Sequence, residues 1–229
     1  MVMARPRILF IDGLPGAGKS TTAMQVGRHF PRSLVYLESA TDHPLLVGSP
    51  DAMGAAFSKI HEVHSAESFS TAALDRLDVF LKAANDSAFY VFESHPIQST
   101  VRVLLQLNAS EPMIERFWRD MQDSLSLGSV EPRLLYLREN DPRQALSEIF
   151  QKRGSAWERY VIEAFGHFPW MKSRGLSGIS GVSQLFVEYS AVIDRLVAGW
   201  RFPSLALPAR PASYEERSET IMRWLALET

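Results

Sequence analysis

A glycine-rich stretch near the start of the chain, IDGLPGAGKSTTA at residues 11–23, contains the residue types that bind phosphate. It has the spacing G-x-x-x-x-G-K-S, with the apolar run Ile8–Ile11 before it and a helix predicted over Thr21–Phe30. In that setting backbone N–H groups and the N-terminal end of the helix face phosphate oxygens. Lys19 is then expected along the β- and γ-phosphates, and the hydroxyl of Ser20 at Mg²⁺. The predicted nucleotide contacts are Gly13, Leu14, Pro15, Gly16, Ala17, Gly18, Lys19, Ser20 and Thr21.

Two glutamates, Glu38 and Glu93, follow apolar runs in the related stretches VYLESATDHP and VFESHP. The carboxyl ends of parallel strands gather at one edge of a sheet, so both carboxylates are expected near the phosphate loop. One can order a water on Mg²⁺, and the other can take the proton of an attacking hydroxyl. We assign Glu93 to the metal with Ser20 and Glu38 to the phosphoryl acceptor, with the reverse order left open. The competing interpretation is that each glutamate is a solvated turn residue.

Further candidate contacts to the acceptor lie just beyond the two glutamates. They are Asp42 and His43 after the first glutamate, and His95 and Gln98 after the second. The competing interpretation of each, taken alone, is an ordinary loop or cap residue. A catalytic histidine is not required, because phosphoryl transfer depends on positioning and charge.

A basic segment, residues 151–174, begins inside the stretch LLYLRENDPRQALSEIFQKRGSAWERY. Its positive residues outnumber Glu158 and Glu163; they are Lys152, Arg153, Arg159, Lys172 and Arg174. An arginine can bind phosphate in two places and offset charge that develops during transfer. We therefore predict a lid over residues 151–181, with Arg153 catalytic and Trp157 at the acceptor. The competing interpretation is a solvated helix end, where basic residues are common.

These residues need a parallel sheet to position them. Short apolar runs that alternate with helical periodicities indicate an α/β fold with βα units in a single domain over residues 1–229. The strands are predicted at Arg7–Asp12, Ser33–Glu38, Ala88–Glu93, Arg133–Arg138 and Ser204–Leu207. Apolar stripes that include Leu77, Phe117 and Tyr189 recur at helical spacing and are predicted to be core. An irregular stretch over residues 39–70 is predicted to bind the acceptor.

The composition is that of an ordinary globular protein, with 229 residues, 46% hydrophobic and 22% charged. A net charge of −2 gives no basic field for nucleic acid or an anionic membrane, so neither is an expected partner. The absence of cysteine excludes disulfides and thiolate metal sites. No signal-peptide core and no apolar run long enough to span a bilayer is found, so a cytoplasmic protein is expected.

Taken together, IDGLPGAGKSTTA, the acidic end of FYVFES and the passage YLRENDPRQAL…QKRG resemble the nucleoside and nucleotide kinases of the P-loop superfamily, the thymidylate-kinase-like group in particular. The resemblance implies a three-layer αβα fold whose five parallel strands have the order 2-3-1-4-5. It also implies that Lys19 and Ser20 hold phosphate and Mg²⁺, that Arg153 belongs to a lid, and that the loop after the last strand borders adenine.

The chain departs from this group after Glu93, where Ser94 and His95 stand in place of the usual arginine. The departure leaves room for an acceptor other than a nucleotide, such as a nucleoside, a sugar or an antibiotic-like metabolite. The chain has no N-K-x-D motif and no D-x-x-G in a setting that would suit a GTPase. We therefore predict an ATP- and Mg²⁺-dependent kinase that acts on a small molecule, with a homodimer left open. The alternative is a nucleotide-binding regulatory ATPase or switch without a small acceptor.

Overall fold

A five-stranded parallel sheet in the order β2-β3-β1-β4-β5 forms the centre of the computed structural model, which describes residues 5–47, 60–85 and 88–226. The strands are β1 (Arg7–Gly13), β2 (Ser33–Tyr36), β3 (Phe89–Glu93), β4 (Glu131–Arg138) and β5 (Ser204–Pro208). The predicted fold class and strand order are confirmed. The predicted end of the second strand is wrong, because β2 stops at Tyr36 and not at Glu38.

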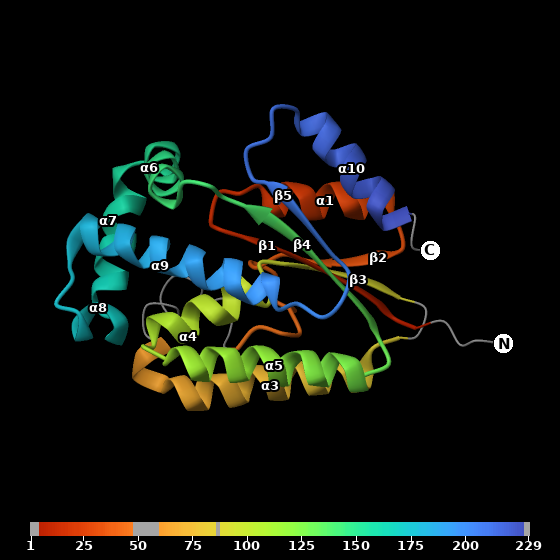
Figure 1. Ribbon diagram of the computed structural model, residues 1–229, viewed down its shortest axis with the longest axis horizontal. Coiled ribbons are helices and arrows are strands. Elements are labelled where there is room, and N and C mark those ends of the chain that lie inside the picture. Colours follow the sequence, from red (N-terminus) through yellow and green to blue (C-terminus); the bar gives the residue numbers. More distant parts are fainter. Residues whose placement is uncertain (1–4, 48–59, 86–87, 227–229) are drawn as a thin grey trace.

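Helices cover both faces of the sheet (Figure 1). On one face lie α1 (Lys19–His29) and α10 (Tyr214–Ala226). On the other lie α3 (Ala66–Ala83), the π-helix η2 (Ile97–Val101) that continues into α4 (Arg102–Gln106), α5 (Glu111–Leu127) and α9 (Gly178–Ala198). The arrangement is the expected three-layer αβα sandwich.

The alternation of side chains along β1 explains the two layers of core. Ile8 and Phe10 belong to the apolar cluster under α3, α5 and α9, whereas Leu9 and Ile11 belong to the cluster under α1 and α10. A strand buried on both faces has no polar alternation, which is why it reads as a continuous apolar run. The helical stripes predicted to be core lie on α3, α5 and α9 and face the first cluster.

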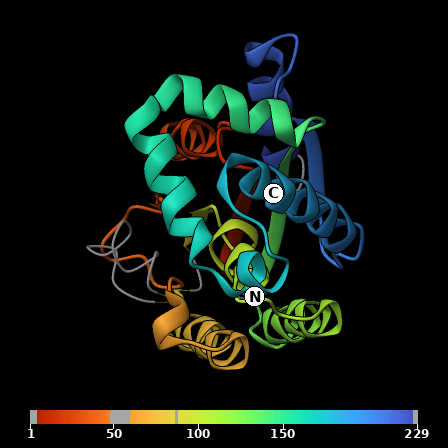
Figure 2. The same cartoon turned by 90° about the vertical axis from the view of Figure 1, so that its left-hand side faces the viewer.

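Three further helices stand at the end of the sheet where the strands have their carboxyl ends (Figure 1). They are α6 (Pro142–Arg153), α7 (Ser155–Gly166) and α8 (Pro169–Ser173). The Asp141 carboxylate caps α6 by accepting hydrogen bonds from the backbone N–H groups of Arg143 and Gln144, each at 3.0 Å. Figure 2 shows α6 and α7 meeting at an angle beside α1.

Two further expectations concern the stretch predicted to bind the acceptor and the possibility of a membrane-spanning helix. The stretch predicted to bind the acceptor, residues 39–70, lies partly outside the described residues, since 48–59 are not among them. In the described part of the chain, no helix combines the length and the apolar character needed to cross a membrane.

Candidate active site

The phosphate loop connects β1 to α1 and has a shape that glycine makes accessible. Gly16 and Gly18 have φ angles of 85° and 91°, in the left-handed region that side chains disfavour. A Cβ on Gly16 would lie 2.8 Å from a side-chain carbon of Ile149, so the loop packs directly against α6. The N-terminus of α1 has no side-chain cap, which leaves its dipole directed into the loop. This cradle fits the phosphates of a nucleotide.

Lys19 is buried at the first position of α1, with 4% of its surface exposed. Its Nζ donates one hydrogen bond to the Leu14 carbonyl oxygen at 3.0 Å and another to Gln98 Oε1 at 2.7 Å. Burial lowers the pKa of Lys19, and the negative charges of Glu93, Asp12 and Glu38 act against that shift.

Asp12 fixes the start of the loop to the segment after β3. Its carboxylate is fully buried and accepts hydrogen bonds from the backbone N–H groups of Gly13 (2.9 Å), Ile97 (2.6 Å) and Gln98 (3.1 Å). Burial raises the pKa of Asp12 to about 7, although Lys19 and these three donors act in the opposite direction. The sequence reasoning did not select Asp12, whose signal is an acid directly before the first glycine of the loop.

Glu93 ends β3 and faces Ser20, as the shared strand-end geometry predicts. Ser20 Oγ donates to Glu93 Oε1 at 3.2 Å, and the neighbouring Ser94 Oγ donates to the same oxygen at 2.7 Å. The other oxygen, Oε2, accepts the backbone N–H of Glu38 at 2.8 Å. A hydroxyl and a carboxylate in contact form a set of hard oxygen donors that suits Mg²⁺, which keeps most of its waters.

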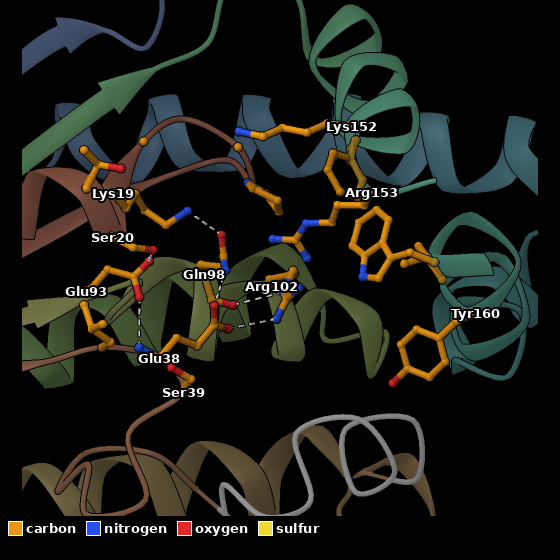
Figure 3. A pocket seen from close by; sticks show the side chains of 18 of the residues that line it. Lys19, Ser20, Glu38, Ser39, Glu93, Gln98, Arg102, Lys152, Arg153 and Tyr160 are labelled. Atoms are coloured by element: carbon orange, nitrogen blue, oxygen red, sulfur yellow. Dashed lines mark hydrogen bonds and ion pairs between the residues drawn. The ribbon is translucent and has the colours of Figure 1, made fainter. Parts of the chain in front are cut away.

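Glu38 lies two residues beyond β2, which corrects the predicted strand. The chain turns after Leu37, whose carbonyl oxygen accepts the N–H of Ala40 at 2.9 Å, and the N–H of Glu38 bonds to Glu93 and not to a strand neighbour. The turn directs the Glu38 side chain towards Gln98 and Arg102 (Figure 3). Glu38 Oε2 accepts from Gln98 Nε2 at 2.6 Å, and Oε1 lies 3.5 Å from a guanidinium nitrogen of Arg102.

One cavity of about 630 Å³ joins these groups. The structure brings together in it most of the predicted site: Pro15, Gly16, Gly18, Lys19, Ser20, Thr21, Glu38, Glu93, Gln98, Arg153 and Trp157. Figure 3 shows Lys152, Arg153 and Tyr160 of α6 and α7 on one side, and on the other side Lys19, Ser20, Glu38, Glu93, Gln98 and Arg102. The lining also includes an apolar wall, made of Trp157, Val161 and Phe165 of α7 and Phe186 of α9.

Only some of the cations of the basic segment line the cavity. Lys152 and Arg153, at the C-terminal turn of α6, line the cavity, and the Arg153 guanidinium lies 4.6 Å from the ring centroid of Trp157. Arg174 instead packs on Trp170 and donates to Asn108 Oδ1 at 2.7 Å. The remaining predicted cations, Arg159 and Lys172, are exposed and are not among the lining residues.

Three predicted acceptor contacts are not among the residues that line the cavity. Asp42 is exposed, whereas His43 and His95 are buried against Phe92 and against each other, with ring centroids 5.9 Å apart. Burial lowers the pKa of His43 to about 4 and holds the pKa of His95 well below its usual range. Both rings are therefore neutral packing groups behind Glu93.

The structure adds lining residues that the sequence reasoning missed. The polar ones include Arg102, and the aromatic ones include Tyr160, Phe165 and Phe186. The spacing of four between Gln98 and Arg102 was a signal, because residues at that spacing share one face of a helix. The aromatic residues of α7 gave no such signal, since their helical spacing also fits a core.

The chain shares its fold with P-loop nucleoside and nucleotide kinases over nearly its full length. Deoxyadenosine kinase from M. mycoides, solved with bound dATP, is 18% identical with a TM-score of 0.54, and the match covers 95% of this chain and 98% of that one. Thymidylate kinase from Candida albicans is 14% identical with a TM-score of 0.53 and coverage of 98% and 92%. Shikimate kinase from Acinetobacter baumannii, in complex with shikimate, is 13% identical with a TM-score of 0.52 and coverage of 99% and 96%. No protein-family model and no curated protein matches the sequence.

Proposed function

We propose that this protein is an ATP- and Mg²⁺-dependent kinase that transfers the γ-phosphate to a small molecule. The observation that carries the proposal is the shared cavity, which has Lys19 and Ser20 of the phosphate loop at one end and the Glu38 carboxylate opposite them. A protein that only holds a nucleotide has no need for a second carboxylate on the far side of the phosphate loop.

On the nucleotide side, the loop N–H groups and Lys19 would bind the phosphates. Ser20 and Glu93 would hold Mg²⁺, which when bound neutralises charge on the phosphate oxygens. Lys152 and Arg153 would approach the same oxygens from α6, which gives residues 151–181 the role of a lid. The stacking of Arg153 on Trp157 restricts where its guanidinium can lie.

On the acceptor side, Glu38 would take the proton of the attacking hydroxyl. A carboxylate has about four lone-pair sites, and the hydrogen bond from Gln98 and the ion pair with Arg102 leave room for one more donor. Those two contacts also fix the orientation of the carboxylate, so that it is already positioned for proton transfer.

The wall of the cavity indicates the chemical class of the acceptor. Trp157, Val161, Phe165 and Phe186 offer an apolar surface in the same cavity as the carboxylates, which suits a molecule with a planar or apolar part and a hydroxyl group. The kinases of similar fold act, by name, on a nucleoside, a nucleotide and a hydroxylated acid, so this fold serves all three kinds of acceptor. A nucleoside-like or other hydroxylated metabolite, antibiotics included, fits this wall.

The decisive experiment is a transfer assay on the purified full chain. A thermal-shift screen of nucleosides, nucleotides and hydroxylated metabolites, with the non-hydrolysable analogue AMP-PNP and Mg²⁺, selects acceptors, and mass spectrometry then follows phosphate transfer from ATP. We expect a phosphorylated product with at least one of them. Hydrolysis of ATP that no acceptor changes, but that a protein or nucleic acid stimulates, would instead identify a regulatory ATPase.

A further inference from the structure

The Gln98 side chain lies between the two halves of the cavity and is bonded to both (Figure 3). Its Oε1 accepts from Lys19 Nζ at 2.7 Å, and its Nε2 donates to Glu38 Oε2 at 2.6 Å. These partners fix the orientation of the amide, because the opposite one would place an NH₂ group against an ammonium and an oxygen against a carboxylate. A neutral side chain therefore connects the phosphate-loop lysine to the carboxylate of the acceptor side.

The backbone holds Gln98 firmly in this position. Its N–H donates to Asp12 Oδ1 at 3.1 Å, and its carbonyl oxygen accepts from Arg102 Nε at 3.1 Å. The residue belongs to the π-helix η2, whose five residues are all buried. Such widened turns are frequent at functional sites, and here the Gln98 side chain lines the cavity.

The two bonds of Lys19 cannot both persist when it binds a nucleotide. An ammonium has three N–H donors, and in this structure two of them are used by Leu14 and Gln98. Contact with oxygens of both the β- and the γ-phosphate requires two donors. The Leu14 carbonyl belongs to the same loop as Lys19, whereas Gln98 belongs to another element, so the bond to Gln98 is the one to be released. An anionic oxygen is also the stronger acceptor of the two.

We propose that Gln98 is a positioning residue that links nucleotide binding to acceptor binding. Lys19 exchanges Gln98 Oε1 for a phosphate oxygen, and the released amide oxygen then accepts a hydrogen bond from the acceptor beside Glu38. The site for the acceptor is thereby completed only after the nucleotide is bound. This inference rests on the proposed function in one respect, namely that Lys19 binds a triphosphate.

The test measures the affinity for AMP-PNP with Mg²⁺ by calorimetry, which needs no acceptor. Gln98→Met removes the amide oxygen that competes with phosphate for Lys19. We therefore expect the analogue to bind about fivefold more tightly, which is the change in affinity that the net free energy of one hydrogen bond gives. In Gln98→Glu a carboxylate faces Lys19 and repels the phosphates, so we expect binding weaker by about tenfold or more. If Gln98→Met fails to fold, the affinity of the isosteric Gln98→Glu carries the test, and binding as tight as in the wild type would overturn the proposal.

Gln122→Met is the matched control. Gln122 is a buried amide on α5 that accepts the N–H of Arg201 at 2.8 Å and donates to the Gly199 carbonyl oxygen, and it is not among the residues that line the cavity. Its replacement should lower the melting temperature and leave the affinity unchanged. In a Lys19→Ala background, Gln98→Met should no longer tighten binding.

The outcomes separate this inference from the proposed function. Wild-type protein that binds the analogue, together with a Gln98→Met variant that binds it equally or less tightly, overturns the role of Gln98 alone. Tighter binding that persists without Lys19 overturns it as well. Wild-type protein that does not bind the analogue at all overturns both the inference and the kinase proposal.

Discussion

The buried histidine His43 makes the stability of this protein depend on pH. Its ring lies against Tyr36, Phe92 and His95, its Nδ1 accepts the N–H of Leu45 at 3.2 Å, and its Nε2 has no hydrogen-bond partner among the described residues. Protonation at Nδ1 would place a charge among these rings and break the bond from Leu45, and burial lowers the pKa of His43 from 6.5 to about 4. His43→Asn removes the titrating group and keeps an acceptor for the Leu45 N–H.

The sign and size of the effect follow from proton linkage. Between pH 6.5 and pH 4 the unfolded chain binds a proton at His43 that the folded chain does not, so the free energy of unfolding falls as the pH falls. A pH of about 5 lies roughly 1.5 units below the ordinary pKa of histidine. Each unit corresponds to ~1.36 kcal/mol, so the free energy of unfolding falls by about 2 kcal/mol. Asp12, whose pKa is raised, acts in the opposite direction. Its contribution is the same in both proteins and cancels in the comparison.

The assay is urea unfolding of both proteins at about pH 7.5 and about pH 5, followed by circular dichroism. His43→Asn is expected to be the less stable protein at the higher pH, because it loses ring contacts. On acidification the wild type should lose about 2 kcal/mol more than the variant. His29→Asn is the control, since it removes an exposed histidine of α1. Equal losses in wild type and His43→Asn would refute the reasoning, because His43 would then titrate alike in the folded and unfolded chains.

Three further predictions concern the cavity. Lys19→Ala should weaken binding of AMP-PNP with Mg²⁺ by about 10- to 100-fold, as expected for a lost charged hydrogen bond, and calorimetry measures it. Glu38→Gln should retain that binding and lower the rate of phosphate transfer in the transfer assay by about 10²–10⁴-fold, which is the usual contribution of a general base to a rate. An unchanged transfer rate would show that Glu38 is not the base. Gly16→Ala should lower stability by about 1–2 kcal/mol or more, because it places a side chain at a positive φ and against Ile149; an unchanged urea midpoint would contradict this.

The fold could be predicted because its signals are local. The phosphate-loop spacing fixes one strand and one helix, and the apolar runs mark the other strands, whose observed bounds differ from the expected ones by one or two residues. The end of β2 was predicted too late because Leu37 continues the apolar run of that strand. The turn that ends the strand depends on the Glu93 carboxylate, which takes the N–H of Glu38 from 55 residues away. Such a partner is not visible in the local sequence.

The direction of a polar side chain was harder to predict than its place in the chain. His43 and His95 stand close to the two glutamates in sequence, but the rings of Tyr36 and Phe92 surround them with apolar surface. Arg102 was missed for another reason, because no helix was predicted over residues 97–106 and its spacing of four from Gln98 was therefore not used. The burial of the two histidines does not follow from residue types and spacing alone.

The charges that line the cavity indicate which positive side chains could compensate the charge of a bound nucleotide. Lys19 and Arg102 face Glu38 and Glu93 in one bonded network, so two positive charges already oppose two negative ones. Binding of an anionic nucleotide adds negative charge in a partly buried space, where an uncompensated charge is costly. Lys152 and Arg153 line the same cavity from its exposed side, where a long side chain can move without breaking a buried bond. Together with the proposed Mg²⁺ and the N–H groups of the phosphate loop, these two cations of α6 would compensate that charge, which supports the proposal of a lid.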